Sequence, residues 1–193
     1  RGQDEGTAAM IAIHEDGVGN LFSLRASLAY LGLASEVTGD PDRLRAADGI
    51  ILPGVGAFGD AVTRLRATGL VPTLDALVRD GKPLLGICLG LQLLFETGYA
   101  YGDWEGLGYL PGCIRPLAPA LSEGLKVPHI GWNALSILDA DEPLVRDVPG
   151  GAHVYYVHSF YATDCAPYVS AGSTHGVFIP GIVRQGNVCG TQF

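Results

Sequence analysis

A cysteine framed by two glycines is the feature of this sequence with the clearest chemical meaning. Residues 86–90 read Gly-Ile-Cys-Leu-Gly, between an apolar run at 83–87 and a segment of helical periodicity. This is the G-x-nucleophile-x-G elbow with cysteine in place of serine, in which a tight strand-to-helix turn presents the nucleophile at the carboxyl end of a sheet. We therefore predict that Cys88 is a nucleophile. A buried cysteine without this frame usually packs as a small hydrophobe, which is the prediction for Cys113, Cys165 and Cys189.

A thiol that attacks a carboxamide needs hydrogen-bond donors for the oxyanion that forms. The elbow places Cys88 at the start of a helix, where free backbone N–H groups favour thiolate over thiol. The N–H of Leu89 is one expected donor to the oxyanion. The second is expected from residues 53–56 (Pro-Gly-Val-Gly), which end the preceding strand. Their glycines let a peptide N–H turn toward the site, so Gly54 and Val55 complete the predicted oxyanion loop.

A cysteine nucleophile normally works with a histidine. The sequence does not distinguish among the five that it contains, which are His14, His129, His153, His158 and His175.

Hydrophobic periodicity predicts the elements that must position these groups. Apolar runs predict strands at 10–14, 34–38, 49–52 and 83–87, the first followed by a glycine turn at 15–20. Helical spacing predicts helices at 21–33, 40–47, 60–79 with a break near Gly69 and Pro72, and 89–97. Shorter segments at 126–132, 152–161 and 176–182 predict antiparallel strands returning over one edge. The fold class is thus α/β, a single domain with a mostly parallel central sheet flanked by helices in three layers.

Composition limits the partners and the compartment. The 193 residues carry 12 basic and 20 acidic side chains, a net charge of −8, so we expect neither nucleic acid nor a membrane surface as a partner. No apolar run reaches the roughly 20 residues that cross a bilayer. The four cysteines form no C-x-x-C pair, which predicts reduced thiols in a cytoplasmic protein. We expect no metal and no cofactor.

Six segments resemble the class I, triad-type glutamine amidotransferases, and within them the glutaminase subunits of imidazole glycerol phosphate synthase. The elbow alone would indicate only the superfamily, which includes anthranilate, GMP and CTP synthases. The segments at 53–59 (Pro-Gly-Val-Gly-Ala-Phe-Gly) and 129–133 (His-Ile-Gly-Trp-Asn) point to histidine biosynthesis. The others are 17–21, 86–92, 157–161 and 190–193.

The resemblance implies a function and a partner. Cys88 would attack the amide of glutamine, ammonia would leave, and water would hydrolyse the glutamyl thioester to glutamate. The ammonia would pass to a (β/α)8-barrel cyclase subunit, with which the chain forms a heterodimer, and the cyclase would make imidazole glycerol phosphate and AICAR.

The same resemblance implies roles for further residues. It places Gly54 to Gly56 at the oxyanion loop, with Gly56 also beside the substrate. Gln92, one helical turn after Cys88, would lie beside the bound glutamine. The remaining assignments are Glu96 beside the glutamine, Ser159 and Phe160 against its α-amino and carboxylate groups, and Trp132 and Asn133 near the partner interface.

Two departures from the family pattern leave alternatives open. In the family, Gly-Thr-Gln-Phe is followed at once by His-Pro-Glu, which supplies the catalytic base and its orienting carboxylate, whereas this sequence ends at Phe193. We expect the native chain to continue. Residues 1–9 are expected to be an upstream extension or a cloning remnant, which gives a domain of 10–193. Residues 14–16 (His-Glu-Asp) stand where the family has an apolar residue followed by Asp-Tyr.

The alternative functions are three. The chain could be the glutaminase subunit of another amidotransferase such as anthranilate synthase, an unrelated elbow hydrolase or thiol-redox protein, or a catalytically incomplete partner that only binds and regulates.

Overall fold

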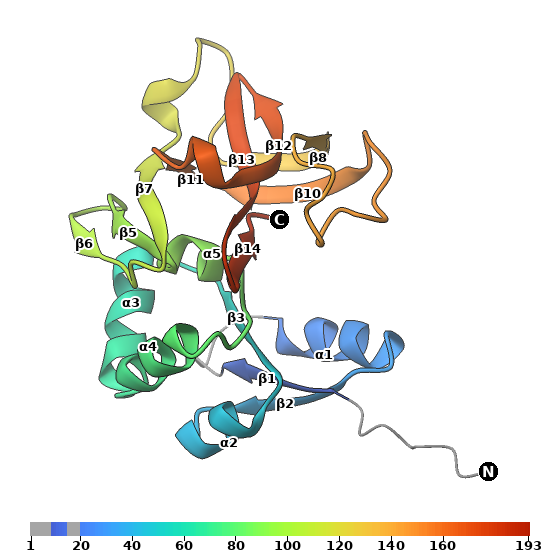
Figure 1. Ribbon diagram of the computed structural model, residues 1–193. Coiled ribbons are helices and arrows are strands. Elements are labelled where there is room, and N and C mark those ends of the chain that lie inside the picture. The colour runs from blue at the N-terminus through green and yellow to red at the C-terminus, as the bar shows by residue number, and fades with distance from the viewer. Residues whose placement is uncertain (1–8, 15–19) are drawn as a thin grey trace.

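The computed structural model describes residues 9–14 and 20–193, so residues 15–19 of the predicted turn, which include most of the unusual 14–16 segment, lie outside the described residues. A mixed sheet forms the centre of the fold, in the order β2-β1-β3-β4-β14-β13-β12-β9 (Figure 1). Its parallel strands are β1 (Met10–His14), β2 (Ala34–Thr38), β3 (Gly49–Gly54), β4 (Leu84–Cys88) and β14 (Val188–Thr191). Its antiparallel strands are β9 (Ser136–Ile137), β12 (Val169–His175) and β13 (Val177–Gln185).

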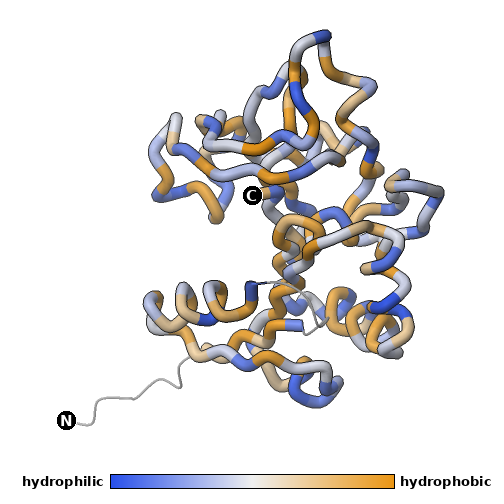
Figure 2. Tube along the Cα trace, turned by 180° about the vertical axis from the view of Figure 1, so that it is seen from behind, coloured by the Kyte–Doolittle hydropathy of each residue, from blue (hydrophilic) through white to orange (hydrophobic). Residues whose placement is uncertain are grey.

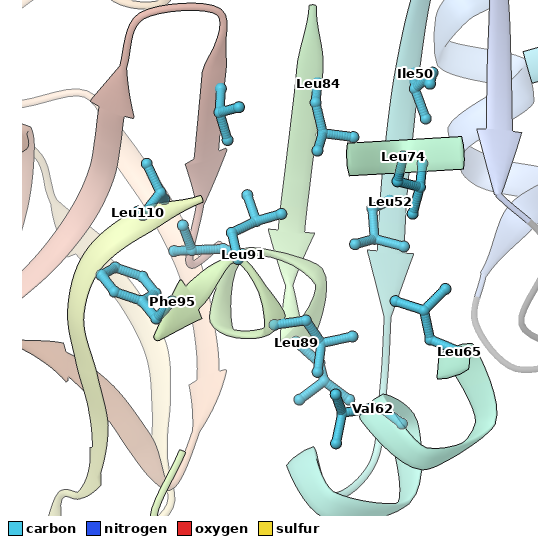
Figure 3. Close-up of a cluster of buried hydrophobic side chains, with 14 of the residues drawn as sticks. Ile50, Leu52, Val62, Leu65, Leu74, Leu84, Leu89, Leu91, Phe95 and Leu110 are labelled. Carbon is cyan, nitrogen blue, oxygen red and sulfur yellow. The ribbon is translucent and has the colours of Figure 1, made fainter. Parts of the chain in front are cut away.

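Helices cover both faces of the parallel strands. They are α1 (Leu21–Tyr30), α2 (Pro41–Ala46), α3 (Phe58–Ala67), α4 (Val71–Arg79) and α5 (Leu89–Leu93). Successive residues of a strand point to opposite faces, so Ile50 and Leu52 pack in the large core with α3, α4 and α5 (Figure 3). Ile51 points the other way, into a smaller cluster with Leu28 of α1. The three-layer prediction is confirmed, and the central sheet is mixed, with a parallel part β2-β1-β3-β4-β14 and an antiparallel part β13-β12-β9.

Local sequence signals mark the helix ends. The Asn20 side chain accepts a hydrogen bond from the backbone N–H of Ser23 at 3.1 Å and so caps α1. Gly32, at φ 75°, follows its end. The expected break in the segment 60–79 also occurs, since α3 and α4 are separated at Gly69, at φ 72°.

One helix prediction was wrong. The spacing at 89–97 predicts a single helix, but α5 ends at Leu93 and residues 95–98 form a strand, β5 (Phe95–Gly98). This strand lies in a second sheet of order β11-β7-β5-β6, with β6 (Trp104–Glu105), β7 (Leu110–Pro116) and β11 (Phe160–Thr163). Phe95 is fully buried there and pairs with Leu110. A long-range strand pairing overrode a local helical period.

The strands predicted after Tyr99 exist but belong to three different sheets. β13 joins the central sheet, β11 joins the second sheet, and β8 (His129–Ala134) pairs antiparallel with β10 (His153–His158) as a separate ribbon. Figure 2 shows finely alternating polar and apolar residues in this upper part, with apolar residues gathered along the central strands below. Two short 3₁₀ helices, at 118–120 and 166–168, complete the described elements.

All four cysteines are free in the structure. Among the described residues, no helix combines the length and the apolar character needed to span a bilayer.

Candidate active site

Cys88 lies on a strained turn between β4 and α5. Its backbone has φ 55° and ψ −113°, a conformation that side-chain-bearing residues rarely adopt. The flanking glycines make the turn possible by close packing. A Cβ on Gly90 would lie 1.7 Å from the carbonyl oxygen of Leu52, and one on Gly86 would lie 2.7 Å from the Gly90 backbone. The pattern of residue types therefore produces the nucleophile elbow that it predicts.

Cys88 opens into a cavity of about 570 Å³, a size suited to a small ligand. Six other residues that the sequence singled out line the same cavity: Val55, Gly56, Leu89, Gln92, Ser159 and Phe160. The wall is completed by Ala57, Phe58, Tyr101, Pro128, Val157 and His158. The structure thus brings together residues that lie more than a hundred positions apart in the sequence.

The predicted oxyanion loop lies beside Cys88. β3 and β4 are neighbours in the sheet, and their register pairs Gly54 with Cys88. Val55 is 49% exposed and Gly56 has φ 100°, so the loop turns sharply at the cavity wall. The geometry is compatible with the assignment of Gly54, Val55 and Leu89 as oxyanion donors, which stays a prediction.

The electrostatic expectation for Cys88 needs revision. Burial raises the pKa of the Cys88 thiol above its ordinary value, and a hydrogen bond with the Leu89 backbone opposes that rise only in part. The helix that follows has five residues, so its dipole is short. The thiolate therefore requires further donors or a base.

A buried pair of side-chain amides approaches Cys88 from the other side. Gln92, on α5, donates from Nε2 to the carbonyl oxygen of Phe160 at 3.2 Å and to Oε1 of Gln192 at 3.0 Å. The Nε2 of Gln192 lies 3.8 Å from the Sγ of Cys88. Gln92 and Gln192 are 5% and 1% exposed. The side chain of Gln92 is thus fixed at the cavity wall before any ligand arrives.

Ser159 and Phe160 form the junction between β10 and β11 at the cavity. Tyr101 contacts this junction, since its ring packs edge-on against that of Phe160 with the centroids 5.5 Å apart. Glu96 is not among the residues that line the cavity. Its carboxylate accepts a hydrogen bond from the Gly112 N–H at 3.1 Å, so its predicted place beside glutamine gains no support from this geometry.

His158 is the one of the five histidines that lines the cavity with Cys88. Its Nδ1 lies 2.9 Å from the Phe160 carbonyl oxygen and its Nε2 lies 2.9 Å from Nδ1 of His129. Burial lowers the pKa of His158 to about 4, helped by the nearby His129 and His175 and opposed by the Phe160 carbonyl. Both ring nitrogens are engaged within the protein, so His158 is a neutral wall residue in this arrangement rather than a base held on Cys88.

The other histidines lie elsewhere. The ring of His175 stacks on that of His129 with centroids 4.1 Å apart, while His14 is buried on β1 and His153 is exposed at the start of β10.

Trp132 and Asn133 lie on opposite faces of the β8–β10 ribbon. Trp132 is 68% exposed and its ring centroid lies 5.4 Å from that of Tyr155. Asn133 points to the inner face, where its Oδ1 lies 2.8 Å from Nε2 of His129. Of this predicted pair, Trp132 is the one that presents its side chain outward.

Sequence reasoning missed Tyr101, Val157 and Gln192, and it left His158 undistinguished among five. Tyr101 carries no local signal, because only tertiary packing brings it to the cavity, whereas Val157 lies in the 157–161 segment that the resemblance includes. Gln192 belongs to a segment that the resemblance includes, so its position beside β4 could have been inferred from the expected sheet.

The chain belongs to the glutamine amidotransferase class-I family, whose model matches residues 17–193. The fold agrees with this assignment. A crystal structure of a glutamine amidotransferase superimposes with a TM-score of 0.73 at 19% identity, covering 95% of this chain and 88% of that one. The structure of PurLQS from Thermotoga maritima gives a TM-score of 0.72 at 20% identity, covering 96% and 86%.

Within that family, the chain is most informatively compared with the HisH subunits of imidazole glycerol phosphate synthase. It is 45% identical to that of Lactiplantibacillus plantarum over 184 residues, which is 95% of this chain and 86% of the relative. It is 46% identical to that of Bacillus thuringiensis over 185 residues, with the same coverage. The chain therefore belongs to the HisH group.

Proposed function

We propose that this chain hydrolyses glutamine to glutamate and ammonia as the glutaminase subunit of imidazole glycerol phosphate synthase, in histidine biosynthesis. The observation that carries the proposal is the strained Cys88 elbow opening into a cavity, in a chain 45% identical to a HisH subunit. The free thiols support a cytoplasmic location.

The mechanism follows from the position of the thiol. The Cys88 sulfur attacks the amide carbon of glutamine, and the carbonyl oxygen takes up negative charge. Backbone N–H groups of Leu89 and the 54–55 loop would stabilise that oxyanion. Collapse of the intermediate breaks the C–N bond, and the nitrogen leaves as ammonia with the thiol proton. Water then cleaves the glutamyl thioester, which releases glutamate and restores the thiol.

Substrate recognition would use the opposite wall of the cavity. Ser159 and Phe160, at the β10–β11 junction, would meet the α-amino and carboxylate groups, with Gln92 and Gly56 beside the side chain. Glu96 remains a predicted contact that would require rearrangement around β5, because its carboxylate is engaged with Gly112.

A barrel cyclase subunit would dock on the outer face of the β8–β10 ribbon. The register pairs Trp132 with Tyr155 and Ile130 with Val157, and all four side chains are between 44% and 68% exposed. Two adjacent cross-strand apolar pairs on one face, next to the cavity that Val157 lines, are typical of a protein interface. Ammonia released at Cys88 would thus leave close to the partner.

The test is glutamate release from glutamine by the native polypeptide, alone and with a cyclase subunit and its nucleotide substrate. The expected result is strong stimulation by the cyclase and none by the synthase subunit of anthranilate synthase. Stimulation by the anthranilate partner instead would assign the chain to that enzyme. Binding of the cyclase without glutamate release would indicate a regulatory subunit that lacks catalysis.

A further inference from the structure

We propose that Gln192 is a positioning residue for the glutaminase reaction, which donates a hydrogen bond to the Cys88 sulfur and so favours its reactive form. The inference rests on the proposed role of Cys88 as nucleophile. Gln192 follows β14, the strand that pairs with β4 on the side away from β3. Its side chain is 1% exposed, and its Nε2 lies 3.8 Å from the Cys88 Sγ.

The orientation of the Gln192 amide decides whether Cys88 faces a donor or an acceptor. An amide nitrogen and oxygen are nearly alike in shape, so the surrounding hydrogen bonds must assign them. The assignment here starts from the carbonyl oxygen of Phe160, which can only accept. It requires the Nε2 of Gln92 to face it, at 3.2 Å.

The orientation of the Gln192 amide follows from that constraint. The same Nε2 of Gln92 lies 3.0 Å from the Gln192 amide, which must therefore present its oxygen to Gln92. Its nitrogen is then left to point at Cys88. The Phe160 carbonyl oxygen, acting through the side chains of Gln92 and Gln192, thus determines that an N–H group points at the Cys88 sulfur.

A donor at this position meets a need of the site. Burial raises the pKa of the Cys88 thiol, and the Leu89 backbone offsets only part of this rise. A neutral amide donor stabilises the thiolate without adding a second charge to the cavity. It also fixes the sulfur between β14 and the oxyanion loop, since Gln192 is itself held by Gln92.

The first experiment measures the rate of Cys88 alkylation by iodoacetamide against pH in the native polypeptide, with peptide mass spectrometry to separate Cys88 from the other thiols. Gln192→Met removes the donor without adding charge, and we expect its rate at pH 7 to fall about threefold to tenfold. Gln192→Glu keeps the acceptor for Gln92 but places a carboxylate at the sulfur, and we expect a fall of at least about tenfold. Gln185→Met and Gln185→Glu, at the exposed end of β13, are matched controls expected to keep the wild-type profile.

A second variant tests whether Gln92 sets the orientation of the Gln192 amide. The hydrogen bonds of the Gln92 side chain go to Phe160 and Gln192 rather than to the Cys88 sulfur. In Gln92→Glu, an ionised carboxylate would accept from Gln192 and turn the Gln192 amide, so that its oxygen faces Cys88. We expect the alkylation profile to move to higher pH, and Gln192→Met to add little to that shift in the double variant. This variant also keeps the proposal testable if substitution of the buried Gln192 prevents folding, which circular dichroism would detect.

The proposal is overturned if folded Gln192→Met keeps the wild-type alkylation profile, or if Gln92→Glu leaves it unchanged. Alkylation needs neither glutamine nor a partner, so its result is separate from that of the glutaminase assay. If the variants alkylate Cys88 more slowly as expected but the wild-type complex releases no glutamate, the proposed function is contradicted. The inferred hydrogen bond from Gln192 to Cys88 would still stand.

Discussion

The two halves of the chain contribute to the active site in different ways. The first, through α5, is a run of parallel strands and helices in which β3 ends at the 54–56 loop and β4 ends at Cys88. The second half is made of strands that belong to three sheets, and its cavity residues include those at junctions such as Ser159 and Phe160. The difference teaches that the position of Cys88 depends on local backbone geometry, whereas the opposite wall of the cavity depends on how distant strands pair.

The largest expected effect is the loss of the nucleophile. Cys88→Ala should lower glutamate release by the complex at least about 10⁴-fold, because no other described thiol lies in the cavity. Folding and partner binding should persist, as circular dichroism and titration with the cyclase would check. Cys189→Ala, on the neighbouring strand β14, is the control and should keep most of the activity. If both variants lost the same activity, the loss would come from damage to the structure rather than from removal of a nucleophile.

The second effect tests the local geometry of the first half. Gly90→Ala forces a Cβ to within 1.7 Å of the Leu52 carbonyl oxygen, so α5 must move off the sheet. We expect a loss of about 4 kcal/mol in the free energy of unfolding, measured by urea denaturation. Gly150→Ala is the matched control, because a Cβ there meets open space. A small loss for Gly90→Ala would break the view that the elbow depends on close backbone packing.

The third effect concerns the buried histidines of the second half. The pKa of His158 is lowered from 6.5 to about 4, so between these values the unfolded chain binds more protons than the folded one. Stability should therefore fall as the pH drops through this window and level off above it. The groups that face His158 are His129, His175 and the Phe160 carbonyl, none of which is an acid.

The full contribution is about 3 kcal/mol. Urea unfolding should show that the free energy of unfolding falls less between pH 7 and pH 4.5 for His158→Gln than for the wild type. The exposed control His153→Gln should lose as much as the wild type. Parallel curves for all three proteins would show that His158 does not titrate as its burial requires.

The smallest effect tests the outer face of the ribbon. Trp132→Ala should weaken binding of the cyclase by about 2 kcal/mol, since an exposed aromatic at the centre of an apolar face is a typical binding hot spot. Calorimetric titration measures the change. Phe178→Ala, also exposed but on β13, serves as the comparison and should bind normally. If Phe178→Ala weakens binding and Trp132→Ala does not, the partner docks on the central sheet instead.

Much of the first half was predictable from the sequence. Apolar runs and helical spacing located β1 to β4 and α1 to α4, since those elements follow from periods of two and 3.6 residues and from stop signals such as Gly32. The elbow was predictable because glycines at 86 and 90 are a steric requirement of the turn itself. The proximity of Gly54 to Cys88 followed from the expected order of parallel strands.

The sequence by itself therefore determined the Cys88 elbow and the scaffold that displays it, because both depend on contacts within a few residues or between consecutive strands. Only the tertiary structure decided that Phe95 leaves the helix for a strand, that His158 rather than another histidine lines the cavity, and that Gln192 meets Cys88. Each of these rests on a pairing across many positions, and no local pattern of residues encodes which distant backbone will supply the partner.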